Sequence, residues 1–134
     1  MTDTPTQGAA LIVGLGRSGL SAARHLAARG WQLTVTDTRP EPPGAADIAR
    51  IAPQVSCRFG GFDSALLDGA DIVVASPGVS LAEPLLREAQ ARGIEIVGDV
   101  ELFAREVRAP VVGITGTNGK STVTTLVGRM AARA

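Results

Sequence analysis

Residues 9–26, AALIVGLGRSGLSAARHL, contain the pattern that decides the fold. The first six of these residues form an apolar run, which is typical of a strand buried on both faces of a parallel sheet. Apolar side chains then recur at helical spacing over residues 17–29. The motif Gly14-x-Gly16-x-x-Gly19 lies between the strand and the helix. This stretch therefore predicts a strand, a glycine-rich turn and a helix, a unit that often binds a nucleotide.

Strand and helix patterns alternate along the rest of the first hundred residues. Further strands are predicted at 31–37, 55–58, 69–78 and 93–98, and further helices at 45–51, 82–92 and 99–106, the last with Asp99 as its N-cap. Strands that alternate with helices indicate a parallel sheet with right-handed crossovers. We therefore expect an α/β fold, a Rossmann-like parallel sheet of about five strands with flanking helices.

The pattern restarts after Arg108. A strand is predicted at 111–115, followed by a second glycine-rich loop and a helix at 120–132. One strand and one helix cannot bury a hydrophobic core of their own. We therefore expect residues 1–98 to form a complete domain and residues 99–134 to open a second, incomplete domain, so that the chain is a fragment.

Composition excludes several classes of protein. The 13 basic and 13 acidic side chains cancel, so no overall field would attract nucleic acid. The apolar runs are as long as strands and far too short to insert into a membrane. The polar start of the chain does not resemble a signal peptide, and the single cysteine, Cys57, suits a reducing compartment. We therefore expect a cytoplasmic location.

The first glycine loop suits a phosphate group. Gly14 permits a tight turn, Gly16 lets the backbone approach a phosphate, and Gly19 lets the helix pack closely on the sheet. The helix that follows offers unpaired N–H groups and a partial positive charge. Asp37 ends the second strand, where it could accept hydrogen bonds from a ribose. A packed turn without any ligand remains the alternative.

The second loop, GITGTNGKST at residues 113–122, departs from the Walker A pattern. Ile114 stands where that pattern requires a glycine, although three glycines still precede Lys120 at regular spacing. Successive glycines let backbone N–H groups converge on an anion. Lys120, the only lysine among the basic residues, could neutralise phosphate charge, and the Ser121 hydroxyl could join the ligands of Mg²⁺. Two nucleotide-type loops indicate two nucleotides.

A family resemblance follows from these motifs. GITGTNGKSTVTTL closely resembles the ATP loop of the Mur ligases, the ATP-dependent amide-forming enzymes of peptidoglycan synthesis. GLGRSGLSAARHL, DTR, ASPGV and GIEIVGDVELF together resemble the branch of this family that adds glutamate. The resemblance covers nearly the whole chain.

The resemblance implies a role for each domain. Residues 1–98 would bind the UDP of UDP-N-acetylmuramoyl-L-alanine, and residues 99–134 would open the central ATP-binding domain. UDP contacts are implied at Gly14, Gly16, Arg17, Ser18, Gly19, Asp37, Thr38, Arg39, Ser76, Pro77 and Gly78. ATP contacts are implied at Gly116, Thr117, Asn118, Gly119, Lys120, Ser121 and Thr122. Lys120 would be catalytic, and Ser121 would bind Mg²⁺.

The implied reaction joins glutamate to the alanyl carboxylate of the UDP-sugar through an acyl phosphate. ATP and Mg²⁺ are the implied cofactors, and the implied full-length protein is a monomer. The remaining metal ligands and the glutamate site would lie beyond Ala134, so we expect this chain alone to be inactive.

Two other functions remain open from the residues alone. An NAD-dependent oxidoreductase would use the same glycine spacing and Asp37, although it would not need the second loop. A nucleotide-sensing module without catalysis is the other alternative.

Overall fold

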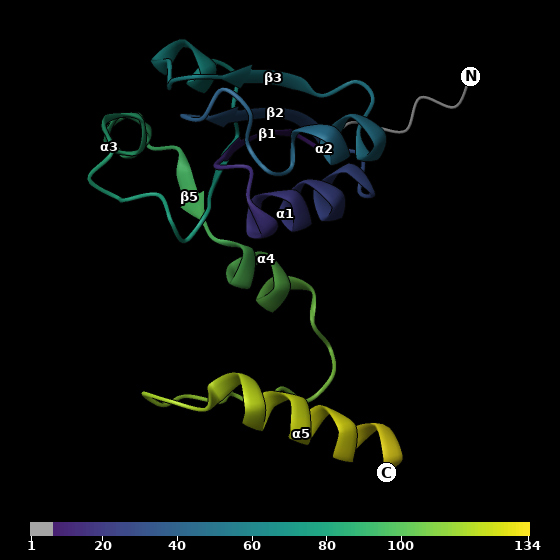
Figure 1. The fold of residues 1–134 in the computed structure, drawn as a ribbon. Helices are drawn as coiled ribbons and strands as arrows, with labels where there is room; N and C mark the ends of the chain where they lie inside the picture. The colour runs from purple at the N-terminus through teal and green to yellow at the C-terminus, as the bar shows by residue number, and fades with distance from the viewer. Residues whose placement is uncertain (1–6) are drawn as a thin grey trace.

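Five strands form one parallel sheet in the order β3-β2-β1-β4-β5 in the computed structural model, which describes residues 7–134 (Figure 1). The strands are β1 (Ala9–Val13), β2 (Gln32–Asp37), β3 (Ser56–Phe59), β4 (Ile72–Ala75) and β5 (Glu95–Val97). The helices are α1 (Arg17–Ala27), α2 (Ala45–Ile51), the short 3-10 helix η1 (Ser64–Leu67), α3 (Pro84–Ala91), α4 (Asp99–Glu106) and α5 (Lys120–Arg133). The predicted α/β fold with a five-stranded parallel sheet is confirmed.

The strand order reverses at β1. The chain proceeds outward from β1 through β2 to β3, and then returns to the other side of β1 to form β4 and β5. Val13, the last residue of β1, therefore pairs with Thr36 on one side and with Ala75 on the other. The carboxyl ends of β1 and β4 lie next to each other, which is where sheets of this kind bind ligands.

Both faces of the sheet are covered, which explains the apolar runs in its strands. Alternate residues of a strand point to opposite faces. Ala10 and Ile12 belong to a core cluster that also contains residues of α1, α2 and α4. Leu11 and Val13 belong to a second cluster with residues of η1 and α3. The central strand β1 thus connects two hydrophobic layers.

Helix α4 packs on the first unit, although the sequence assigned it to the second. Leu102 is 8% exposed and belongs to the same core cluster as α1. Arg29, in the turn that follows α1, donates to Glu106 of α4 over 2.8 Å, from Nη2 to Oε2. The predicted N-cap at Asp99 is wrong by one residue, because Asp99 is already helical and Gly98 occupies the cap.

The predicted strand at residues 111–115 is absent from the described structure. A strand needs a neighbour to satisfy its backbone N–H and C=O groups, and no second sheet is present here. The helix predicted at 120–132 is confirmed as α5, which lies apart from the sheet (Figure 1). Its apolar side chains Val123, Leu126 and Met130 are 46%, 54% and 70% exposed.

Candidate functional site

The turn from β1 into α1 requires glycine at two positions, one in the loop and one in the first turn of the helix. Gly14 has a φ of +92°, and a Cβ there would lie 2.9 Å from the side chain of Ser76. A Cβ on Gly19 would lie 1.9 Å from the carbonyl oxygen of Gly14. Gly16 is different, because a Cβ there would meet no atom within 4 Å. The first and third glycines shape the loop, while the second leaves space above it.

Both neighbouring strands hold this loop. The N–H of Gly14 donates to the Thr36 carbonyl over 2.8 Å, and the Ser76 hydroxyl donates to the Gly14 carbonyl over 2.9 Å. The N–H of Leu15 donates to Oδ2 of Asp37 over 2.7 Å. The first residues of the loop therefore have protein partners from the ends of β2 and β4.

The backbone N–H groups of the next four residues differ from those of Gly14 and Leu15. Among the described residues, no hydrogen bond is made by the backbone N–H of Gly16, Arg17, Ser18 or Gly19. Helix α1 begins at Arg17, its extended N-cap Gly16 supplies no side-chain acceptor, and its first turn carries no acidic residue. An uncapped helix N-terminus attracts an anion through its N–H groups and its dipole. The geometry suits a phosphate at the switch point of the sheet.

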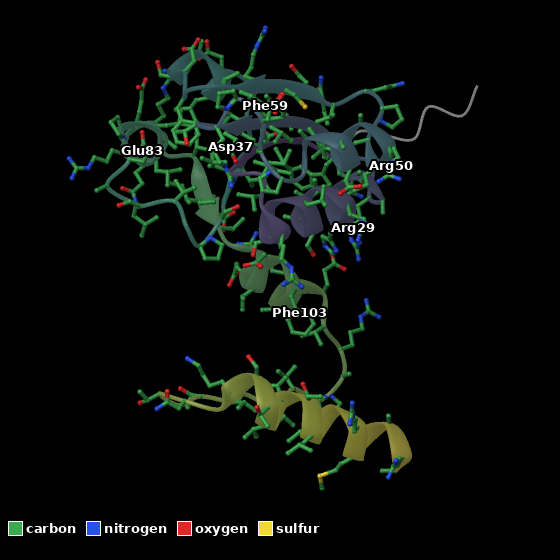
Figure 2. The ribbon with its side chains drawn as sticks, viewed as in Figure 1. Arg29, Asp37, Arg50, Phe59, Glu83 and Phe103 are labelled. Carbon is green, nitrogen blue, oxygen red and sulfur yellow. The ribbon has the colours of Figure 1, made fainter. Side chains whose placement is uncertain are left out.

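Asp37 is a buried carboxylate at the end of β2 (Figure 2). Besides Leu15, it accepts from Arg39 three times: from N and Nε to Oδ1 over 2.9 and 2.8 Å, and from Nη2 to Oδ2 over 2.6 Å. The hydrogen bonds from the Arg39 side chain lower the pKa of Asp37 from 3.8 to about 2. Burial opposes this pKa shift and the Leu15 N–H supports it. Asp37 is thus a stable anion with protein donors on both oxygens.

The turn after β4 closes the other side of the loop. The N–H of Val79 donates to the Ser76 carbonyl over 2.9 Å, which places Pro77 and Gly78 in an exposed turn. The structure brings Ser76, the glycine loop, Asp37 and Arg39 into direct contact. The remaining candidates of this group are Arg17 and Thr38, which are exposed, and Ser18, which is half-buried.

Sequence reasoning missed one residue that supports the loop. The N–H of Gly44 donates to the Leu15 carbonyl over 3.1 Å, and a Cβ on Gly44 would lie 2.9 Å from Cγ of Leu15. This glycine ends the turn-rich stretch that follows β2. Its position after two prolines indicated a turn, but nothing local indicated that the turn packs on the first loop.

The second loop lies outside this arrangement. Gly119 has a φ of +77° and is the N-cap of α5, without a side-chain hydrogen bond. Lys120 and Ser121 are exposed, and α5 lies away from the sheet in Figure 1. The structure therefore does not bring the ATP-loop candidates, residues 116–122, to the first loop. Residues 7–134 contain no group of three or more His, Cys, Asp and Glu side chains that could hold a metal ion.

A separate hollow of about 610 Å³ lies at the opposite end of the sheet. Trp31 and the segment 51–55 line it, and no charged side chain does. None of the motif residues contributes to this hollow. The candidate site is instead an open edge at the carboxyl ends of β1, β2 and β4. Among the described residues, no helix has the length and apolarity needed to cross a membrane.

Comparison with known proteins agrees with this geometry. Residues 8–98 match the family described as "Mur ligase MurD-like, N-terminal domain". The chain belongs to the MurD-like Mur ligases. The matched residues include β1 to β5 and both loops that meet at the switch point.

Curated relatives extend the similarity beyond this domain. The UDP-N-acetylmuramoylalanine--D-glutamate ligase of Nitrosococcus oceani is 55% identical over 124 residues, which are 92% of this chain and 27% of that protein. The ligase of the same name from Pseudomonas aeruginosa is 52% identical and is covered to 28%. The chain thus spans just over a quarter of the length of these relatives.

Solved structures show the same fold. A pseudomurein peptide ligase type C from Methanothermus fervidus aligns with a TM-score of 0.63 and 30% identity, over 86% of this chain and 24% of that one. A murein peptide ligase from Psychrobacter arcticus aligns with a TM-score of 0.69 over 90% of this chain and 25% of that one. At 23% identity, the second likeness concerns the fold alone.

Proposed function

We propose that the chain forms the UDP-sugar-binding domain and the start of the ATP-binding domain of a peptidoglycan ligase. The complete enzyme joins D-glutamate to UDP-N-acetylmuramoyl-L-alanine, the activity in the names of the relatives from Nitrosococcus and Pseudomonas. The observation that carries the proposal is the open N-terminus of α1 at the switch point of a MurD-like domain. Residues 1–98 are the first domain in this proposal, and residues 99–134 begin the second, although their first helix, α4, packs on the first domain.

The diphosphate of the UDP-sugar binds at the start of α1. The free N–H groups of residues 16–19 point to an anion site that needs no side chain. Arg17 and Ser18 add donors to the diphosphate. The uridine lies along Thr38 and Arg39, and the turn of residues 76–78 borders the site on the side of β4. Gly14, Gly19 and Asp37 shape the loop in the same site.

ATP binds at residues 116–122 of the second domain: Gly116, Thr117, Asn118, Gly119, Lys120, Ser121 and Thr122. This part of the chain fits a phosphate because the N-terminus of α5 is uncapped and Lys120 is exposed. Lys120 is the catalytic residue and neutralises phosphate charge, and the Ser121 hydroxyl holds Mg²⁺. Mg²⁺ supplies further neutralisation of charge on the phosphates.

The reaction begins when a carboxylate oxygen of the alanyl group attacks the γ-phosphorus of ATP, so that an acyl phosphate forms and ADP leaves. The amine of glutamate then attacks the acyl carbon, and phosphate leaves as the amide forms. This chain contributes substrate positioning and charge neutralisation. We infer a cytoplasmic enzyme because its proposed nucleotide substrates are cytoplasmic, and we propose that the complete enzyme is a monomer. Without the rest of the ligase, the 134-residue chain has no turnover of its own.

Calorimetric titration tests this function. UDP-N-acetylmuramoyl-L-alanine should bind to the chain, and NAD⁺ at the same concentrations should not. The variant Lys120→Ala should lose ATP binding and keep its affinity for the UDP-sugar, since Lys120 belongs to the other loop. Arg129→Ala removes a positive charge from an exposed position of the same helix α5 and serves as the control for Lys120→Ala. Binding of NAD⁺ in preference to the UDP-sugar would overturn the proposal.

A further inference from the structure

The carboxylate of Asp37 is already fully engaged by the protein. Oδ2 accepts from the N–H of Leu15 and from Nη2 of Arg39, at 2.7 and 2.6 Å. Oδ1 accepts from N and Nε of Arg39, at 2.9 and 2.8 Å. A carboxylate offers about four lone-pair sites, and four protein donors occupy them here.

This occupancy differs from the usual role of an acidic residue at the end of β2. In dinucleotide-binding folds such a residue accepts hydrogen bonds from the ribose hydroxyls. That role requires at least one free acceptor facing the ligand. The side chain of Asp37 is only 3% exposed, whereas that of Arg39, which lies over it, is 51% exposed. The arginine, not the carboxylate, faces the solvent side of the site.

The partner of Asp37 in the loop explains what the carboxylate does instead. Leu15 is 0% exposed and its N–H donates to Asp37, so removal of the carboxylate leaves this buried donor without its protein acceptor. An unsatisfied buried donor is costly, and the chain would shift to satisfy it. The N–H of Leu15 is next in sequence to the free N–H groups that begin at Gly16. A shift at Leu15 would therefore move the phosphate donors themselves.

We propose that Asp37 is a positioning residue for the diphosphate, which acts through the backbone of residues 14–19 and makes no contact with the sugar. The inference rests on the proposed binding of UDP at this loop. It differs from a ribose-binding role in one measurable respect. A residue that positions the loop affects every ligand that carries a diphosphate, whether or not a ribose is attached.

The experiment compares UDP with inorganic pyrophosphate by calorimetry. Both titrations use a Lys120→Ala background, so that the second loop does not contribute to anion binding. Asp37→Ala should weaken the binding of UDP and of pyrophosphate by the same factor, about tenfold. The ratio of the two dissociation constants should stay unchanged. Asp37→Asn keeps one oxygen that can accept from Leu15, so it should restore most of both affinities.

Asp71 provides a matched control. Its Oδ2 accepts from the N–H of Ala9 over 2.8 Å, so it holds a backbone N–H of β1 in the same way, but at the opposite end of the strand. Asp71→Ala should leave both affinities unchanged. Amide hydrogen exchange without ligand gives a second readout. Leu15 should exchange faster in Asp37→Ala and not in Asp71→Ala.

The outcomes separate the inference from the function on which it rests. If UDP fails to bind to the Lys120→Ala protein, the proposed function is wrong and the inference falls with it. If Asp37→Ala or Asp37→Asn weakens UDP and spares pyrophosphate, Asp37 contacts the nucleoside and the inference is wrong while the function stands. Unchanged exchange at Leu15 in both Asp37 variants would also overturn the inference.

Discussion

The chain contains two glycine-rich loops that each precede a helix, and their surroundings differ. The loop before α1 is hydrogen-bonded to Thr36 and Asp37 of β2 and to Ser76, which directly follows β4. The loop before α5 has no strand on either side, and α5 exposes its apolar face. A short motif can set local backbone geometry in both places. Only tertiary contacts from the neighbouring strands hold the first in a fixed conformation.

The glycines themselves show the same difference. A Cβ on Gly19 would collide with the Gly14 carbonyl, whereas a Cβ on Gly119 would meet nothing within 4 Å. Gly119 is needed for its φ of +77°, a conformation that side chains with a Cβ rarely adopt. Gly19 is needed because the helix packs tightly against the loop. Apart from substitutions at Gly119, mutations should therefore be costly in the first region and mild in the second.

The largest effect is expected from Gly19→Ala. The added Cβ would lie 1.9 Å from a backbone oxygen that cannot move without disturbing β1. We expect a loss of more than about 4 kcal/mol in the free energy of unfolding, measured by chemical denaturation. Gly16→Ala is the matched control in the same loop, because its Cβ would be unobstructed and its φ is −88°. Similar losses in both variants would contradict the packing argument.

Two leucines compare the regions directly. Leu86 on α3 is 0% exposed, and Leu126 on α5 is 54% exposed. Leu86→Ala should lower the free energy of unfolding by about 3 kcal/mol, because it leaves a cavity in the second core cluster. Leu126→Ala should change it by less than about 0.5 kcal/mol. A large loss in Leu126→Ala would mean that α5 is packed in solution.

Acid should weaken the first region through Asp37. The pKa of this carboxyl lies at about 2 in the folded chain, below the ordinary 3.8. Folding therefore favours the charged form, so the resulting stability is present above pH 3.8 and is lost as the pH falls toward 2. The expected contribution is about 2 kcal/mol, which follows from the size of the shift.

The pH experiment compares the chain with Asp37→Asn by denaturation at a series of pH values from neutral downward. Other carboxylates contribute equally to both proteins, so the difference between the two curves isolates Asp37. Parallel curves across the acid range would show that the ion pair with Arg39 contributes nothing to folding.

The helices and strands of the first region could be predicted because the side of each element that faces the core is apolar. This burial gives each sequence segment a regular hydrophobic pattern. The run in β1 is apolar at every position since both faces of that strand are covered. The short helix η1 escaped prediction because it is only four residues long, which is too short to show a helical period. The strand predicted at 111–115 was wrong because local apolarity cannot supply a pairing partner.

The candidate site shows a similar limit. The glycine spacing located the loop, and the resemblance named Ser76, which the strand order of the structure places beside that loop. The partners of Asp37 could not be predicted. Its hydrogen bond to Leu15 joins residues 22 positions apart, and no local pattern records which backbone N–H lies beneath a carboxylate.

The smallest effect is expected from removing the second region. A chain that ends at Ala109 loses α5 and the loop before it, both of which are exposed. Its free energy of unfolding should differ from that of the 134-residue chain by less than about 0.5 kcal/mol. A chain that ends at Gly98 also loses α4 and the burial of Leu102, so it should be about 2 kcal/mol less stable. A loss of similar size at both endpoints would show that α5 docks on the sheet, and equal stability of all three chains would place α4 outside the core of the first unit.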